Sequence, residues 1–277
     1  MKFNESDILG LINLSTSVGR DYDKNEIQTV LLSGEIYGHK NEYGEIVSSA
    51  AIILYENNLA SIGMVIVHED FRGLGLAKEA TKKCIDTVPK KTQIMLISTE
   101  EGKPLYKKLG FITIDNVHKY LSDQFLSVQL KKHVVIEDYI EQDLDDVIQL
   151  DSAAFGGRRT NLLSNRIKQS KSCLVAKNNK GKIIGFGLSI IGSANLLIGP
   201  VVAKDSRTAI ELIHELIQNY SGKLRIDVPG DINVEIEEFL TKLGFKQVNT
   251  PPIMVRNSDH LPKRNNQLYA IAAQVFG

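Results

Sequence analysis

The stretch VHEDFRGLGLAKEA, residues 67–80, joins an apolar run to a helical pattern. The apolar run SIGMVIV, residues 61–67, predicts a buried strand, and GLAKEATKKCIDTV, residues 75–88, predicts an amphipathic helix that ends before Pro89. A strand that leads directly into a helix leaves the first N–H groups of the helix without partners. The turn between these two elements, residues 72–77, is therefore the place where a ligand would meet open backbone donors.

The residues of this turn suit an anion. The free N–H groups and the positive end of the helix dipole attract negative charge. Gly73 and Gly75 allow a phosphate to touch the backbone, and Gly75 can take a positive φ without strain. Arg72 adds a charge that can reach a diphosphate. The spacing suits a pyrophosphate, and the alternative is a tight strand-to-helix turn with no ligand.

Two other phosphate loops are less compatible with the turn. A P-loop requires GK followed by Ser or Thr, which is absent here. The dinucleotide fingerprint GxGxxG fails because Lys78 stands at the third glycine position. A nucleotide-phosphate enzyme that uses the same turn would bind ATP with Mg²⁺, but no acidic pair follows the strand. We therefore consider a nucleotide-phosphate enzyme less compatible with the sequence than a pyrophosphate site or a turn without a ligand.

The chain repeats this pattern. Gly44 and Gly181 are 137 residues apart, Gly63 and Gly199 are 136 apart, and the glycines of two LGF triplets, Gly110 and Gly244, are 134 apart. Three ordered anchors with a slowly drifting offset predict two copies of one fold with small insertions and deletions. We therefore expect two tandem domains, residues 1–130 and 131–277.

Each copy reads as an α/β (α+β) domain. Alternating residues in 26–41 and 45–56 around the turn NEYG predict a β-hairpin. An apolar strand is expected at 92–98, followed by a helix from near Pro104 to Gly110 and the strand FITI. HVVIEDY and EQDLDDVIQLDSAAF predict a strand and a helix that open the second copy. Each domain should contain a mixed, mostly antiparallel sheet flanked by helices.

Composition narrows the classes of partner. The chain has 277 residues, with 33 Lys plus Arg and 33 Asp plus Glu, so no global positive field attracts nucleic acid or an anionic membrane. No apolar run approaches the roughly 18 residues of a membrane helix. Cys84 and Cys173 are far apart, and no CxxC or HExxH spacing suggests a metal site. We expect a cytoplasmic protein with free thiols, no metal and no nucleic-acid or membrane partner.

A second motif identifies a family. About thirty residues after the turn comes PLYKKLGF, residues 104–111. The Arg-x-x-Gly-x-Ala turn after an apolar strand, followed by a strand and the Tyr-Lys-Lys-Leu-Gly-Phe end of a helix, resembles the GNAT family of acetyl-CoA-dependent N-acetyltransferases. The resemblance covers residues 30–115 best. The whole arrangement resembles bacterial tandem GNAT proteins that have a complete first domain and a degenerate second one.

The resemblance implies roles for particular residues. The diphosphate of acetyl-CoA, the co-substrate, would bind the turn Arg72, Gly73, Leu74, Gly75, Leu76 and Ala77. The pantetheine arm would pair with the exposed backbone edge of Val65, Ile66 and Val67, and an N–H near Val65 would polarise the thioester carbonyl.

Tyr106 stands where many members of the family have a general acid, and its alternative role is that of a core tyrosine. The sequence departs from the family pattern at two positions. Ser61 replaces a Glu that serves some relatives as the base, and Thr99 replaces an Asn that often contacts pantetheine. The general base is therefore unassigned.

The second copy lacks these parts. IGPVVAKDSRTA has a shortened turn without glycines, Pro200 stands at the position of Met64, and Leu240 at that of Tyr106. We therefore expect this copy to have one of three other roles: it shapes an acceptor pocket, pairs two chains into a homodimer, or binds an effector. Arg158 and Arg159 in FGGRR could bind an acidic substrate group, but a solvated pair at a helix start is the simpler interpretation.

These observations favour direct transfer of an acetyl group from acetyl-CoA to an amine, on a small molecule or a peptide, in a ternary complex. The alternative is a catalytically silent protein that binds CoA or a partner for regulation. The missing Glu and Asn favour the alternative, and the intact turn with Tyr106 favours the enzyme.

Overall fold

The computed structural model describes residues 1–230 and 233–277 and contains two compact units. Unit 1 comprises Met1–Ile114, Ile253–His260 and Val275–Gly277, and unit 2 comprises Asp115–Pro252 and Leu261–Gln274. These units differ from a single cut near residue 130, because residues 115–130 belong to unit 2 and two late segments belong to unit 1. No helix among the described residues is long and apolar enough to cross a membrane.

Unit 1 is built on a mostly antiparallel sheet with the strand order β1-β2-β3-β4-β5-β13. Within the described residues of this sheet, β4 and β5 form the parallel pair. The strands are β1 (Lys2–Phe3), β2 (Gly34–Lys40), β3 (Ile46–Tyr55), β4 (Leu59–Val67), β5 (Gln93–Ile97) and β13 (Pro252–Arg256).

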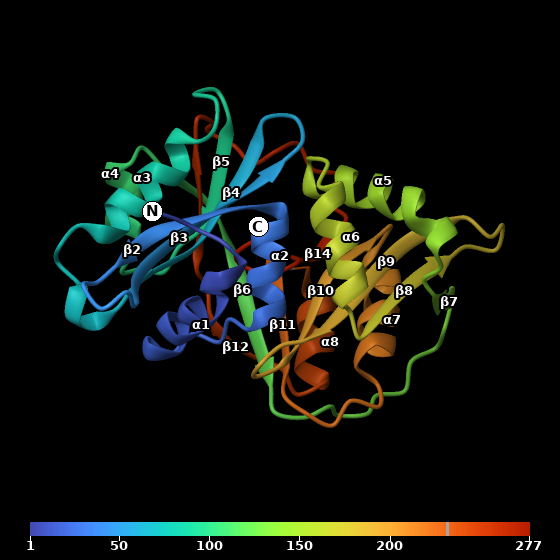
Figure 1. The fold of residues 1–277 in the computed structure, drawn as a ribbon. Coiled ribbons are helices and arrows are strands. Elements are labelled where there is room, and N and C mark those ends of the chain that lie inside the picture. The colour runs from blue at the N-terminus through green and yellow to red at the C-terminus, as the bar shows by residue number, and fades with distance from the viewer. Residues whose placement is uncertain (231–232) are drawn as a thin grey trace. The chain divides into compact units, whose positions relative to one another are not determined.

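The helices of unit 1 lie on both faces of this sheet. They are α1 (Ile8–Ser17), α2 (Lys24–Ser33), α3 (Leu76–Asp86) and α4 (Lys103–Lys108). In Figure 1, α3 lies above β2 and β3, and α1 lies below them. Ala80 and Cys84 of α3 form a core with Ala60 and Ile62 of β4 and with residues of α4. Alternation along β4 therefore directs Ser61 and Gly63 to the opposite face.

The interpretation of residues 26–41 as strand is wrong for its first part, because residues 24–33 form α2. The side chain of Asp23 accepts a hydrogen bond from the N–H of Glu26 at 2.9 Å and thereby caps the helix. Ile27 and Val30, three residues apart, are fully buried on one face of it. Side-chain burial at helical spacing outweighed the β-branched composition of this segment.

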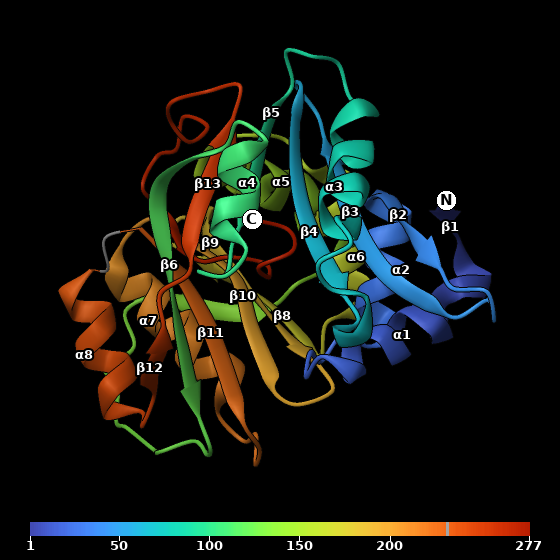
Figure 2. The same ribbon diagram turned by 90° about the vertical axis from the view of Figure 1, so that its left-hand side faces the viewer.

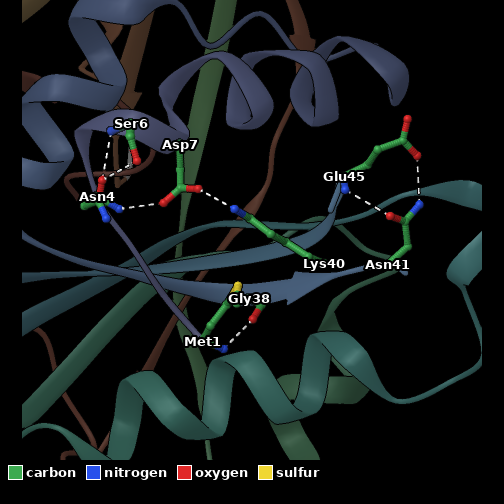
Figure 3. Close-up of polar contacts among 8 residues, drawn as sticks. All are labelled: Met1, Asn4, Ser6, Asp7, Gly38, Lys40, Asn41 and Glu45. Atoms are coloured by element: carbon green, nitrogen blue, oxygen red, sulfur yellow. Dashed lines mark hydrogen bonds and ion pairs between the residues drawn. The ribbon is translucent and has the colours of Figure 1, made fainter. Parts of the chain in front are cut away.

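The predicted turn NEYG is confirmed, and it belongs to a polar network at the edge of unit 1 (Figure 3). The side chain of Asn41 accepts from the N–H of Glu45 at 2.9 Å and donates to its carboxylate at 2.8 Å. Lys40 binds Asp7 at 2.8 Å, and the N-terminal amine donates to the carbonyl of Gly38 at 2.7 Å. These contacts fix β1 and the hairpin of β2 and β3.

Unit 2 repeats the pattern with the strand order β6-β11-β10-β9-β8-β7, while β12 pairs with β6 and β14 pairs with β10. Its strands are β6 (Ile112–Ser122), β7 (Val135–Asp138), β8 (Ser172–Lys177), β9 (Ile183–Ile191), β10 (Leu196–Ala203), β11 (Leu224–Pro229), β12 (Lys246–Asn249) and β14 (Leu268–Ala270). Its helices are α5 (Leu144–Phe155), α6 (Thr160–Gln169), α7 (Ser206–Ile217) and α8 (Val234–Lys242).

The helices of unit 2 also cover both faces of their sheet. Figure 1 shows α5 and α6 in front of β8 to β10, with α7 behind them. Phe186 of β9 packs in the core below α5 and α6, whereas Ile198 of β10 packs in the core below α7 and α8. The parallel pair in this sheet is that of β10 with β11.

Each unit receives one strand from the other half of the sequence. β6 follows α4 of unit 1 in the chain, but its residues from Val117 to Ser122 pair antiparallel with β11 (Figure 2). β13 follows α8 of unit 2, but it pairs antiparallel with β5 of unit 1, where Ile253 lies opposite Ile97 and Arg256 opposite Ile94. The last strand of each sheet is thus exchanged between the two halves of the chain.

Candidate functional site

The glycine-rich turn opens helix α3 without a side-chain cap. After η2 (Glu69–Phe71), Gly73 and Gly75 have φ of 82° and 79°, and Gly75 is the N-cap. A Cβ atom at either glycine would meet nothing within 4 Å, so there is room for a side chain at both positions. Glycine is required because the backbone has a left-handed conformation there. No side chain among the described residues caps the amide groups at the start of α3.

The charges beside this turn are exposed. Arg72 lies 3.5 Å from Glu69, and 59% of its side chain is exposed, so this ion pair contributes little to stability. Leu74 is 67% exposed. Glu79 lies one turn into α3 and pairs with His39 at 3.3 Å. The guanidinium group of Arg72 can therefore turn toward an anion at the helix start at small cost.

Strand β4 leaves its parallel neighbour just before the turn. β4 pairs with β5 only from Leu59 to Ile62, whereas its pairing with β3 continues to Val67. A register shift at Ala51 marks a bulge, and Met64 within it has a φ of 49°. The hydroxyl of Ser49 donates to the Met64 carbonyl at 2.7 Å and holds this conformation. A positive φ at a residue other than Gly or Asn is strained and typical of functional sites.

This departure from β5 makes the end of β4 an open edge. Val65, Ile66 and Val67 lie beyond the last residue pair with β5 and lead into η2 and α3. The turn residues and the β4 residues that the sequence singled out are thus continuous in the fold. The bulge at Met64 was not foreseen, and the neighbouring Gly63 was the sole sequence signal near it.

Tyr106 lies in the same apolar core as Val65. It is buried on α4, and its ring contacts that of Phe111 edge-on with centroids 6.0 Å apart. Burial raises the pKa of Tyr106 above its usual range, while the charge of Arg20, on the segment between α1 and α2, lowers it in part. The core interpretation of Tyr106 and an acid role are compatible, because a buried phenol in an apolar site remains protonated at neutral pH.

Ser61, which stands in place of the Glu of some relatives, binds the end of the chain. Its hydroxyl donates to the carbonyl of Val275 at 3.0 Å, and the Tyr55 hydroxyl donates to the carbonyl of Phe276 at 2.6 Å. A Cβ at Gly63 would lie 2.9 Å from the Cα of Val275, so the close approach of the terminal segment requires glycine. Spacing in the sequence gave no sign of this contact.

The second copy closes the corresponding helix start with its own carboxylate. Asp205 is the N-cap of α7 and accepts from the N–H of Thr208 at 2.9 Å and from its hydroxyl at 2.8 Å. A negative side chain therefore occupies the end of the helix where α3 presents open backbone groups.

The edge of β10 in the second copy is also filled. β10 pairs with β11 only from Leu196 to Ile198 and then, after a register shift, its residues Val201 and Val202 pair with β14. The N–H of Ile271 donates to the carbonyl of Asp227 on β11 at 3.0 Å. The segment around β14 thus supplies a strand between the diverging ends of β10 and β11. The missing residues predict a degenerate copy, but no pattern in the sequence predicts this segment.

The arginines of FGGRR differ in environment, and the interpretation as a solvated pair is wrong for one of them. Arg158 is exposed, but Arg159 is buried and binds Asp151 through two nitrogens at 2.8 and 2.9 Å. Arg159 is the N-cap residue of α6, and its side chain reaches Asp151 on α5.

Two family models match the chain. Both are described as an acetyltransferase (GNAT) domain, and they cover residues 20–131 and 147–270. A Bacillus subtilis (strain 168) protein named "Uncharacterized N-acetyltransferase YitH" is 36% identical over 278 residues, which is all of this chain and 98% of that protein.

Solved structures show the same fold. A putative acetyltransferase from Pyrococcus horikoshii superposes with a TM-score of 0.83 at 22% identity and covers all of this chain and 95% of its own. A tandem GNAT protein from the clavulanic acid biosynthesis pathway has a TM-score of 0.65 at 12% identity, with 92% and 97% covered. The predicted fold class of two tandem GNAT-like domains is thereby confirmed.

Proposed function

Because the chain belongs to the GNAT family of acetyltransferases, we propose that unit 1 binds acetyl-CoA and transfers its acetyl group directly to an amine in a ternary complex. Acetyl transfer itself follows from the full-length likeness to a protein named an N-acetyltransferase, and this chain is an enzyme of that class. The observation that carries the finer proposal is the uncapped start of α3 next to the unpaired end of β4.

We propose that the start of α3 binds the diphosphate. The residues are Arg72, Gly73, Leu74, Gly75, Leu76 and Ala77. The open space at both glycines fits a bulky phosphate, and backbone N–H groups of a helix start favour negative charge. Val65, Ile66 and Val67 would pair with the amide-rich pantetheine arm, because an unpaired strand edge offers donors and acceptors as a neighbouring strand does.

Tyr106 is proposed as the general acid. The amine nitrogen attacks the thioester carbonyl, the C–S bond breaks, and the thiolate receives a proton from Tyr106. The nitrogen loses one proton to solvent water, and the Tyr106 phenolate regains a proton from solvent, so that the products are the amide and the free thiol of CoA. A thiol has a pKa of about 8.5, so full transfer from a phenol with a raised pKa is uphill. Arg20 lowers the pKa of Tyr106 and narrows this difference. The phenol would first hydrogen-bond the departing sulfur and then give up its proton as the thiolate charge develops.

Unit 2 is proposed to bind no acetyl-CoA. The cap by Asp205 places negative charge where a diphosphate would bind, and β14 pairs with the strand edge that a pantetheine arm would require. One acetyl-CoA per chain follows. The acceptor would be a small-molecule or peptide amine in the cytoplasm, with no nucleic acid, membrane or metal involved, and a homodimer is compatible with this scheme.

The alternative function is that of a silent CoA-binding or partner-binding regulator. It is favoured by Ser61, which stands where some relatives have a base and which already donates to Val275. The two functions share the binding of acetyl-CoA and differ in turnover.

The test is calorimetric titration of acetyl-CoA into the whole chain, followed by a thiol-release assay with a panel of amines. We expect one site per chain and release of free CoA with at least one amine. Two sites per chain would contradict the proposal that unit 2 binds no acetyl-CoA. The absence of binding at millimolar acetyl-CoA would contradict the proposal that unit 1 transfers an acetyl group from acetyl-CoA. Binding without release for any amine would support the regulator instead.

A further inference from the structure

A row of three residues crosses the sheet of unit 1 on the face that α3 covers. His39 of β2 lies opposite Ser48 of β3, and Ser48 lies opposite Val67 of β4. Residues directly opposite each other in neighbouring strands point to the same face of the sheet. Tyr37, two residues before His39, packs in the core to which α3 contributes. The row therefore lies on the α3 face and ends at the strand edge proposed for the pantetheine arm.

His39 joins a buried hydroxyl group to an exposed carboxylate. Its Nδ1 lies 2.7 Å from Oγ of Ser48, and its Nε2 lies 3.3 Å from Oε1 of Glu79 on α3. Ser48 is fully buried, whereas 74% of the Glu79 side chain is exposed. A hydroxyl group both donates and accepts, and Nε2–H faces the carboxylate, so these contacts are compatible with a neutral and with a protonated ring.

Glu79 is the acidic residue in the first turn of α3. Side chains on a helix lean toward its N-terminus, and a carboxylate there is attracted to the amide groups of the helix start. These are the amide groups after Gly75 that are proposed to bind the diphosphate. In unit 2 the carboxylate of Asp205 binds the N–H of Thr208 at such a helix start. A carboxylate of Glu79 that is not held elsewhere therefore competes with the diphosphate and repels it.

The contact with His39 weakens this competition in two ways. It holds the Glu79 carboxylate over β2, and a protonated imidazole ring offsets the negative charge. Histidine is the side chain that ordinarily changes its charge between about pH 5 and pH 8. The potential at the start of α3 therefore becomes more positive as the pH falls through this range.

The other charged side chains around His39 have different partners. The ion pairs of the neighbouring elements are Lys2–Glu35 of β1 and β2, Lys40–Asp7 of β2 and η1, and His68–Asp70 after β4. Lys83 of α3 lies 6.0 Å from the centroid of the Tyr37 ring. In the part of the chain that the structure describes, Glu79 is the carboxylate within 4.0 Å of His39.

We propose that His39 is a positioning residue of the acetyl-CoA site: it holds the Glu79 carboxylate over β2 and, when protonated, offsets its charge, so that acetyl-CoA binds more tightly as the pH falls from about 8 to about 6. His39 acts through Glu79 and takes no part in the transfer of the acetyl group. This inference rests on the proposed function of unit 1 and adds a pH dependence to it.

The experiment is calorimetric titration of acetyl-CoA into the whole chain at pH 6 and at pH 8, with the ionic strength held constant. The proteins are the wild type, His39→Gln, Glu79→Gln and the double variant. His39→Gln removes the titrating ring and retains an amide that can bond the Ser48 hydroxyl. His260→Gln is the matched control, because His260 is an exposed imidazole of unit 1 that lies 3.8 Å from Asp259.

The quantity compared is the ratio of the dissociation constant at pH 8 to that at pH 6. The phosphate group of acetyl-CoA and His68 also titrate in this range, but they do so in every protein of the series. The ratio should be about threefold larger for the wild-type protein and His260→Gln than for His39→Gln, the effect of one partly exposed ion pair. In the Glu79→Gln background, His39→Gln should change either constant by less than about twofold.

Three results would count against His39. An equal ratio in the wild-type protein and His39→Gln would remove the pH dependence from His39. An equal loss of affinity with and without Glu79 would show that His39 acts by supporting the fold and not through the carboxylate. If His39→Gln does not fold, an undiminished ratio in Glu79→Gln, a change at an exposed position, would overturn the inference.

Failure of the proposed function gives a different result. In that case the wild-type protein binds no acetyl-CoA at either pH, and the inference falls with the site. If the wild-type protein binds acetyl-CoA with the same ratio as His39→Gln, the site stands and only the role of His39 is refuted.

Discussion

Helices α3 and α7 occupy equivalent places in the two units, but they begin differently. Gly75 starts α3 with a left-handed backbone and no side-chain cap, whereas Asp205 starts α7 with a carboxylate that binds Thr208. The first arrangement leaves backbone donors for a ligand, and the second uses them for the protein's own stability. A difference of a few residues at a helix start thus separates the proposed binding site from a structural turn.

The strands that precede these helices show the same contrast. β4 and β10 both leave their parallel neighbours after a few residue pairs and both contain a register shift. The edge of β10 pairs with β14, whereas β4 after Ile62 pairs with β3 alone in the described part of the chain. The same pair of diverging strands therefore holds a segment of the chain in unit 2 and would hold the pantetheine arm proposed for unit 1.

The largest expected effect tests the chemistry of unit 1. Tyr106→Phe should lower kcat for acetyl transfer by about 100-fold, because a general acid contributes on this order. The KM for acetyl-CoA should change little. The Tyr106 hydroxyl makes no hydrogen bond among the described residues, so the variant should fold normally. Steady-state kinetics with an accepted amine measures the effect.

Tyr120→Phe is the matched control for this variant. Tyr120 is a buried tyrosine of unit 2 whose hydroxyl donates to Gln247 at 3.1 Å. Its replacement should cost about 1 kcal/mol of stability and leave kcat unchanged. Equal kcat in Tyr106→Phe and the wild-type protein would remove Tyr106 from the mechanism.

A smaller effect is expected at the start of α3. Arg72→Gln should raise the dissociation constant of acetyl-CoA about tenfold, because one charge-assisted contact with the diphosphate is lost. Calorimetric titration gives the constant, and the difference should shrink as salt is added. Arg207→Gln, in the first turn of α7, is the control and should bind acetyl-CoA as the wild-type protein does. The same loss in both variants would mean a general charge effect and no site at Arg72.

The smallest effect concerns the cap of α7. Asp205→Ala should lower the free energy of unfolding by about 1 kcal/mol and leave the acetyl-CoA stoichiometry at one per chain. Burial alone would raise the pKa of Asp205, but hydrogen bonds from Thr208 and the charges of Lys204 and Arg207 hold it below its usual value.

The stabilisation by Asp205 therefore depends on pH. It is complete above about pH 4, the usual pKa of a free aspartate, and it disappears as the pH falls through the lower pKa of the folded state. Thermal melts of both proteins from pH 7 down to pH 3 measure this difference. Asp145→Ala, an exposed acid in the first turn of α5, is the control. A difference in melting temperature that is as large at pH 3 as at pH 7 would show that the cap does not act through its charge.

Much of the local structure follows from short-range patterns. The continuous apolar run at 61–67 became β4, the amphipathic run after the glycines became α3, and Pro104 lies in the first turn of α4. These predictions succeeded because periodicity, capping and turn residues act over a few positions. The segment 24–33 is the exception, since its β-branched residues are compatible with both helix and strand and burial decided between them.

The sequence by itself determined the two-fold repeat, the glycine turn before α3 and the loss of that turn in the second copy. Only the tertiary structure decided the exchange of β6 and β13, the filling of the β10 edge by β14 and the contact of Val275 with Ser61. The physical reason is sequence distance. Pairing between strands far apart in the chain depends on which edges remain open after the local elements have formed, and no spacing of residues records that choice.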